Sequence, residues 1–159
     1  VNAIRSASAT NSFISVTEDG NVAMFRTGGN PHCHVILRGG KSPNYDAASV
    51  AACEEELKKA GLIKNVMIDC SHGNSNKDHR NQKLVLDEIA LQINSGNKSI
   101  IGVMLESNLE EGNQPIPDDL SDLKYGVSIT DACIDWSTTE TLLREFAGSL
   151  SESLESRAV

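Results

Sequence analysis

The 159-residue sequence has no apolar run long enough to cross a membrane. A membrane-spanning helix needs about 20 predominantly apolar residues, and no charged segment leading into an apolar one marks a secretion signal at the amino terminus. We therefore expect a soluble, cytoplasmic protein without a membrane partner. Hydrophobic residues still make up 39% of the chain, which is enough to build the core of a single domain.

Basic residues are scarce and scattered along the chain. The formal net charge is −8 at pH 7, whereas non-specific binding to nucleic acid requires clustered lysine and arginine side chains that neutralise phosphates. The composition therefore argues against a nucleic-acid partner.

Paired cysteines and an initiator methionine are absent as well. The four cysteines form no CxxC pair, and cysteines within apolar segments are typical of buried, reduced thiols rather than disulfides. The chain begins at Val1, and residues 1–8 resemble the end of a helix that has no start signal. We therefore expect a piece of a longer chain or a processed product.

The first clear structural pattern is a β-hairpin within residues 8–28. Residues 13–17 and 22–26 are rich in β-branched and aromatic side chains, and the turn residues 18–21 separate them. Two such segments joined by a short turn predict two antiparallel strands.

Three strand–helix units are predicted over residues 32–150. Each begins with a short apolar run bounded by turn residues, which is typical of a buried strand, and each continues into an amphipathic helical segment. The predicted strands are residues 34–37, 66–69 and 99–105, and the predicted helices run from Asp46 to Ala60, between Asn81 and Gly96, and onward from a capping box at residues 137–140. In the last helix we expect buried side chains at Leu142, Leu143, Phe146 and Leu150, followed by a frayed tail over residues 151–159.

Alternation of buried strands with amphipathic helices predicts an α/β fold with a parallel sheet. Three units are too few to close a barrel by themselves, but they suffice for part of one. A small, open, doubly wound sheet is the alternative architecture.

Each of the three predicted core strands is followed by a residue with a charged or metal-binding side chain. These residues are Arg38, His72 and Glu106, and they are evenly spaced along the sequence. The carboxyl ends of parallel strands lie on one face of the sheet, so we expect the three side chains to converge. Singly, each has another interpretation: His72 as a hydrogen-bonded structural residue, Glu106 as a helix cap, and Arg38 as the partner of Asp69.

Asp131, shortly before the last helix, adds a further carboxylate. Together with His72 and Glu106 it forms a mixed nitrogen and oxygen ligand set that suits a divalent ion such as Mn²⁺, Fe²⁺, Co²⁺ or Zn²⁺. The planar, permanently charged guanidinium of Arg38 is suited to binding a phosphate through two hydrogen bonds. The residues therefore predict Lewis-acid chemistry on a phosphorylated metabolite, with a metal-dependent aldolase or hydrolase on another scaffold as the alternative.

Five segments closely resemble the carboxyl-terminal half of type I 3-deoxy-D-arabino-heptulosonate 7-phosphate (DAHP) synthases. The segments are Leu37–Gly40, Met67–Ser75, Ile101–Ser107, Glu111–Gln114 and Tyr125–Cys133, and the likeness extends from about Phe13 to Phe146. It implies the last three βα units of a (β/α)8 TIM barrel with an extra β-hairpin. It also implies condensation of phosphoenolpyruvate with erythrose 4-phosphate, the first step of the shikimate pathway to aromatic amino acids.

The resemblance also implies roles for single residues. His72, Glu106 and Asp131 match the metal ligands of the family, and Arg38 matches a group that holds the phosphate of phosphoenolpyruvate. His72 is also a candidate for proton transfer, and Asp131, like Arg38 and His72, is expected beside the substrates. The family's cysteine ligand, its Lys-Pro-Arg-Thr segment for erythrose 4-phosphate and its lysine for phosphoenolpyruvate would lie upstream of Val1. We therefore expect this chain alone to be inactive and unstable without the amino-terminal half of the barrel.

A similar hairpin in the family helps to form a pocket for an aromatic amino acid effector. Phe13, Ser15 and Phe25 occupy the matching positions. The alternative is a hairpin that only covers the barrel or supports a subunit contact in a homo-oligomer. A non-catalytic module that senses an aromatic amino acid is the alternative function from a different class.

Overall fold

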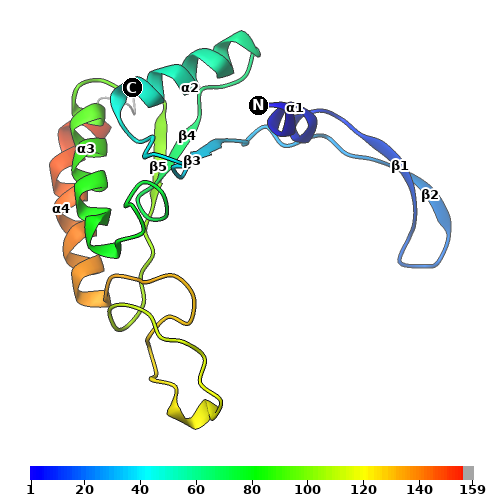
Figure 1. The fold of residues 1–159 in the computed structure, drawn as a ribbon. Helices are drawn as coiled ribbons and strands as arrows, with labels where there is room; N and C mark the ends of the chain where they lie inside the picture. Colours follow the sequence, from blue (N-terminus) through cyan, green and yellow to red (C-terminus); the bar gives the residue numbers. More distant parts are fainter. Residues whose placement is uncertain (156–159) are drawn as a thin grey trace.

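The computed structural model describes residues 1–155 (Figure 1). The described helices are α1 (Asn2–Ser8), α2 (Ala47–Lys59), α3 (Gln82–Asn94) and α4 (Trp136–Glu155), with 3-10 turns η1 (His79–Asn81) and η2 (Leu120–Asp122). The described strands are β1 (Ser12–Val16), β2 (Val22–Arg26), β3 (Val35–Leu37), β4 (Val66–Asp69) and β5 (Ile100–Met104). Within this part of the chain, no helix combines the length and apolar character that crossing a membrane requires.

β1 and β2 form the predicted hairpin. The strands are antiparallel, and Phe13 lies opposite Phe25. The turn is closed by a hydrogen bond from the Gly20 amide to the Thr17 carbonyl oxygen at 2.9 Å, and Gly20 has a φ of +78°, a conformation that favours glycine. Figure 1 shows the hairpin standing away from α2, α3 and α4.

β3, β4 and β5 form a three-stranded parallel sheet with β4 in the centre. Leu37 of β3 pairs with Ile68 of β4, and Ile68 pairs in turn with Val103 of β5. Val66 and Ile68 are completely buried, because β4 has a strand on each side and contributes to the main hydrophobic core. The predicted α/β class and parallel sheet are confirmed.

The two helices that connect the core strands begin and end near the predicted residues. Asp46 caps α2 by accepting a hydrogen bond from the Ser49 amide at 3.0 Å, and hydrogen bonds from Ser49 lower the pKa of the Asp46 carboxyl. In α3, the three expected inward positions are buried: Val85, Ile89 and Ile93. These helices therefore cover the sheet with the faces that the sequence pattern indicates.

The start of α4 differs from the prediction. The helix begins at Trp136, and the carboxylate of Asp135 accepts a hydrogen bond from the Thr138 amide at 2.6 Å, which lowers the pKa of Asp135. Asp135 therefore caps the helix, and the predicted capping box beginning at Ser137 is wrong. Aspartate and serine are both favourable residues at a helix N-cap, so the local sequence alone does not distinguish Asp135 from Ser137.

The buried face of α4 is narrower than predicted. Leu142 and Leu150 are buried and Phe146 packs against the core, but Leu143 is 43% exposed. One residue advances about 100° around a helix of 3.6 residues per turn, which carries Leu143 out of the contact that α4 makes with α3. Of the expected frayed tail, the segment up to Glu155 is helical, and residues 156–159 lie outside the described residues.

Candidate metal centre

His72 follows β4 in a strained backbone conformation. Its φ is +46°, in the left-handed region that residues with a Cβ seldom adopt. The His72 carbonyl oxygen accepts hydrogen bonds from the Lys77 amide at 2.8 Å and from Ser75 Oγ at 3.2 Å. Backbone strain of this kind persists only where surrounding contacts hold it, and it concentrates at functional sites.

One ring nitrogen of His72 is bound to Asp69. The distance from His72 Nδ1 to Asp69 Oδ2 is 2.7 Å, and Asp69 is buried at the end of β4. Asp69 therefore pairs with His72 and not with Arg38, which removes one alternative interpretation of Arg38.

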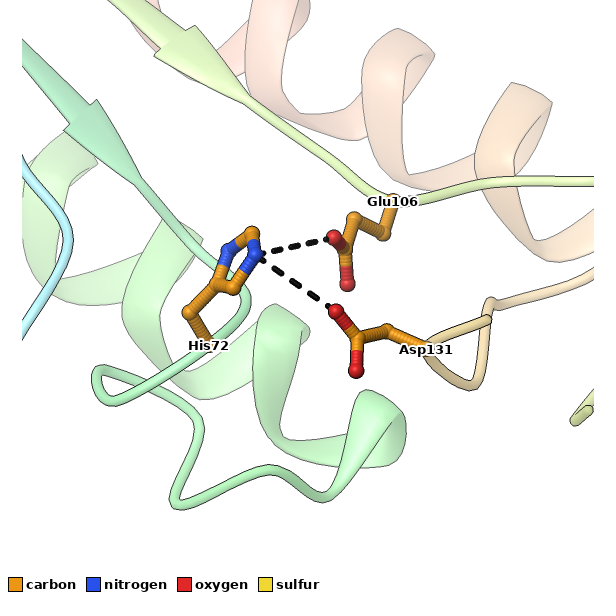
Figure 2. A group of neighbouring side chains, drawn as sticks. All are labelled: His72, Glu106 and Asp131. Atoms are coloured by element: carbon orange, nitrogen blue, oxygen red, sulfur yellow. Dashed lines mark ion pairs between the residues drawn. The ribbon is translucent and has the colours of Figure 1, made fainter.

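The other ring nitrogen faces two carboxylates, as Figure 2 shows. His72 Nε2 lies 3.3 Å from Glu106 Oε1 and 3.7 Å from Asp131 Oδ2. One ligand atom from each residue falls within a group whose atoms are all within 4.8 Å of one another. The convergence expected from the spacing of the strand ends is therefore present for His72 and Glu106, and Asp131 joins them.

Glu106 is positioned by a buried side chain of α3. The Glu106 amide donates to Gln82 Oε1 at 2.8 Å, and Gln82 Nε2 donates to the Glu106 carbonyl oxygen at 3.0 Å. Gln82 is fully buried, so its amide can satisfy both backbone groups without competition from water. These paired hydrogen bonds hold the chain just beyond β5.

Asp131 reaches the site because both ends of a long loop are tied together. The Gly112 and Cys133 backbones exchange hydrogen bonds at 2.9 and 3.1 Å, and the Ile134 amide donates to the Glu106 carbonyl oxygen at 3.1 Å. These contacts return the chain to the end of β5. The Asp131 carboxylate therefore lies opposite the Glu106 carboxylate, although the two residues are far apart in sequence.

The separations of these atoms fit a bound metal ion. Ligand atoms at about 2.0–2.2 Å from an ion such as Zn²⁺ are separated from one another by about 3.0–3.6 Å. Of the two nitrogen-to-oxygen distances, 3.3 Å lies within that range and 3.7 Å lies just above it. One imidazole and two carboxylates also form a donor set suited to first-row divalent ions. The residues present therefore fit a divalent metal ion.

Arg38 lines the same cavity as His72, Glu106 and Asp131. The cavity has a volume of about 190 Å³, and Lys77 and His79 also line it. Lys77 and His79 were not predicted as site residues from the sequence. The only signal for them there is their position in the polar loop after β4. His79 Nε2 is 2.7 Å from Glu111 Oε1, so this histidine links the loop after β4 to the long loop that carries Asp131.

The loops that carry Arg38 and His72 pack closely against each other at Gly39 and Gly73. A Cβ placed on Gly39, whose φ is +75°, would lie 2.5 Å from the Gly73 carbonyl carbon. The Gly73 amide donates to the Arg38 carbonyl oxygen at 3.1 Å. The buried amide of Asn74 bridges both strands, because its Nδ2 donates to the carbonyl oxygens of Leu37 and Asp69. The backbones at Arg38 and His72 are therefore fixed relative to each other.

Comparison with known proteins identifies the family to which this chain belongs. The sequence profile of the DAHP synthetase I family matches residues 1–144. The chain belongs to this family. The resemblance described from five sequence segments is thereby confirmed.

Individual DAHP synthetase I relatives match over nearly the whole chain. The Tyr-sensitive phospho-2-dehydro-3-deoxyheptonate aldolase of Salmonella typhimurium is 54% identical over 157 residues, covering 99% of this chain and 44% of the relative. The Phe-sensitive enzyme of Escherichia coli K12 is 51% identical over 150 residues, covering 94% of this chain and 43% of the relative. The solved structure of the aldolase from Francisella tularensis SCHU S4 is 46% identical with a TM-score of 0.83, covering 94% of this chain and 43% of that chain. This chain thus spans less than half the length of these relatives.

Among the described residues, no cysteine belongs to the group formed by His72, Glu106 and Asp131. Cys70, next to Ser71 and His72, is completely buried in the hydrophobic core, and burial raises the pKa of its thiol to about 12. A thiol with such a pKa is protonated at neutral pH and is a poor metal ligand. Cys70 therefore belongs to the core and not to the metal group.

Phe13, Ser15 and Phe25, the proposed effector residues, lie together on the hairpin. The rings of Phe13 and Phe25 are stacked, with centroids 5.8 Å apart and an interplanar angle of 11°. Ser15 follows Phe13 by two positions on the same strand, so the three side chains share one face of the hairpin.

Proposed function

We propose that this chain is the carboxyl-terminal part of a DAHP synthase, which condenses phosphoenolpyruvate with erythrose 4-phosphate and consumes one water to form DAHP and inorganic phosphate. The observation that carries the proposal is the grouping of His72, Glu106 and Asp131 in a cavity that Arg38 also lines. Membership of the DAHP synthetase I family supports the same reaction.

The proposed fold is the last three βα units of a (β/α)8 barrel over residues 32–150, with an extra hairpin. In such a barrel, helices cover only the outer face of the sheet. Leu37 and Val103 pack against the helix-covered core, whereas Ile36 is 43% exposed. Ile36 and Leu37 are neighbours on β3, so their side chains point to opposite faces. A sheet covered on one face supports a barrel wall over a doubly wound sheet.

Each proposed ligand has a separate task in holding the ion. His72 would bind it through Nε2, and Glu106 and Asp131 would each offer a carboxylate oxygen. A bound Mn²⁺, Fe²⁺, Co²⁺ or Zn²⁺ ion supplies Lewis-acid polarisation of a carbonyl oxygen or activation of water. Nδ1 is engaged by Asp69, and a ring nitrogen that binds an ion through its lone pair cannot carry a proton at the same time, so the ligand role is favoured over proton transfer by this residue.

Arg38 would orient the substrate beside this centre. Its guanidinium is permanently charged and can donate two parallel hydrogen bonds to a phosphate group. The close contact between Gly39 and Gly73 fixes its backbone relative to that of His72, which limits where the guanidinium can hold a phosphate. Positioning of this kind lowers the entropic cost of bringing reactants together.

Product analysis of the full-length protein tests the proposed reaction. Phosphoenolpyruvate, erythrose 4-phosphate and a divalent ion are expected to yield one DAHP and one phosphate for each phosphoenolpyruvate consumed. Formation of no heptulosonate would reject the proposal. Condensation with a different aldehyde instead would identify another metal-dependent aldolase.

Replacing Arg38 with alanine is expected to raise the KM for phosphoenolpyruvate roughly 10- to 100-fold, with a smaller change in kcat. Loss of a hydrogen bond to a charged group costs about 1.5–3 kcal/mol, and a lost ground-state contact appears mainly in KM. Arg38→Lys should have a smaller effect because it keeps the charge but not the planar fork. Arg144→Ala, an exposed change on α4, is the control, and an unchanged KM in Arg38→Ala would refute the assignment.

We further propose that the Phe13, Ser15 and Phe25 face of the hairpin contributes to binding an aromatic amino acid effector. The stacked rings of Phe13 and Phe25 offer an apolar surface, and the Ser15 hydroxyl adds a polar group beside it. The names of the relatives in Salmonella typhimurium and Escherichia coli describe sensitivity to tyrosine and to phenylalanine respectively.

Replacing Phe25 with alanine is therefore expected to raise the inhibitor concentration that halves activity by about tenfold or more, equivalent to ~1.4 kcal/mol. Tyrosine and phenylalanine are titrated separately against the full-length enzyme. Met24→Ala is the matched control, because Met24 is exposed on the opposite face of the same strand. Equal loss of inhibition in both variants, or in neither, would contradict an effector surface on the Phe25 face.

A further inference from the structure

We infer that Asp69 is a positioning residue, which holds the His72 imidazole with its proton on Nδ1 and so presents the unprotonated Nε2 to the metal. This inference rests on the proposed function of His72 as a ligand. It assigns a role to a buried carboxylate that touches neither the proposed metal ion nor the substrates.

Both oxygens of the Asp69 carboxylate are engaged. Oδ1 accepts hydrogen bonds from the Ser71 amide at 2.8 Å and from Ser71 Oγ at 2.6 Å, while Oδ2 lies 2.7 Å from His72 Nδ1. The Asp69 side chain is 3% exposed, so water does not compete for these contacts. The carboxylate therefore has one fixed orientation.

This arrangement selects one tautomer of His72. An ionised carboxylate only accepts hydrogen bonds, so a contact of 2.7 Å with Oδ2 is favourable only when Nδ1 carries the proton. Ser71 Oγ also lies 2.7 Å from Nδ1, and because its own hydrogen is donated to Asp69, it too acts as an acceptor there. In the neutral ring, Nε2 then carries the free lone pair.

The selected nitrogen is the one that faces the proposed ligands. Nε2 points at Glu106 and Asp131 (Figure 2), and metal-binding histidines commonly donate their other ring N–H to a carboxylate. The main chain of Asp69 is fixed as well, because its carbonyl oxygen accepts a hydrogen bond from the buried Asn74 side chain at 2.8 Å. Asp69 thus holds the ring in the direction that metal binding requires.

Asp69→Asn is the sharpest variant because it preserves size and shape. The Ser71 amide and hydroxyl both need an acceptor, so the new carboxamide oxygen should remain on their side. Its NH₂ group would then face His72 Nδ1 and favour the lone pair there, which moves the ring proton to Nε2. The wrong tautomer would oppose metal binding without creating a cavity.

Two measurements on the full-length protein test this inference. In the metal-free wild type, ¹⁵N NMR of labelled histidine should assign the neutral His72 ring as the Nδ1–H tautomer, and Asp69→Asn should shift it toward Nε2–H. Equilibrium dialysis with Co²⁺ should give a dissociation constant about 10- to 100-fold higher in Asp69→Asn than in wild type. Asp87→Asn, an exposed change on α3, is the matched control and should alter neither result.

The outcomes separate this inference from the proposed function. An Nε2–H tautomer in the wild type would overturn the role of Asp69 whether or not the variant folds. Unchanged Co²⁺ affinity in a folded Asp69→Asn protein would overturn it too, while leaving the metal centre intact. Wild-type protein that binds no Co²⁺ through His72 would instead reject the proposed function on which the inference rests.

Discussion

Replacement of His72 by alanine is expected to lower the affinity for a divalent ion by more than about 100-fold and to reduce the synthase rate in parallel. Losing only the hydrogen-bond partner of a ligand costs roughly 10- to 100-fold in affinity or activity, so loss of the ligand itself should cost more. The variant also leaves Asp69 buried without its ring partner, which adds a structural cost. Metal content after dialysis, measured by elemental analysis, gives the result directly.

Two substitutions away from the cavity control for general effects. His32→Ala removes an exposed histidine from the segment before β3, and Lys58→Ala removes a charge from the exposed side of α2. Both should keep wild-type metal content and rate. Full metal content in His72→Ala would show that this residue is not a ligand.

The isolated 159-residue chain is expected to show no measurable synthase turnover and to unfold at low denaturant concentration. β3 and β5 each have only one paired neighbour among the described strands, and exposed strand edges favour association with other chains. Ile36 and Ile101 of the sheet are also exposed. The relatives are more than twice as long as this chain, and we propose that the amino-terminal half covers these surfaces and completes the site.

Coexpression with the amino-terminal half provides the control for the isolated chain. The two halves together should recover both a cooperative unfolding transition and DAHP formation. Substantial turnover by the isolated chain would contradict the proposal that it is an incomplete barrel.

Most of the elements that carry the site could be predicted from local patterns. β4 is recognisable because Val66–Ile68 is a short apolar run between polar segments, and such a run is typical of a strand buried on both faces. The even spacing of the residues that follow the strands indicated that His72 and Glu106 would meet. This step required only that the strands be parallel, which fixes all their carboxyl ends on one side.

Other features depend on contacts that no local pattern contains. Asp135 caps α4 in preference to Ser137 because the neighbouring Ile134 is tied to Glu106, and Leu143 is exposed because packing against α3 selects a narrower face. The pairing of Asp69 with His72 occurs with a left-handed backbone at His72, which residue type does not predict. Side-chain arrangements of this kind depend on tertiary context, which overrides local preference.

The proposed function depends on His72, Glu106 and Asp131 binding one divalent metal ion. Anomalous diffraction from crystals of the full-length protein grown with Mn²⁺, with data collected on both sides of the manganese absorption edge, tests it most directly. We expect a single strong anomalous peak in contact with His72 Nε2 and with a carboxylate oxygen of both Glu106 and Asp131. A manganese peak bound elsewhere, with these three side chains free of metal, would contradict it.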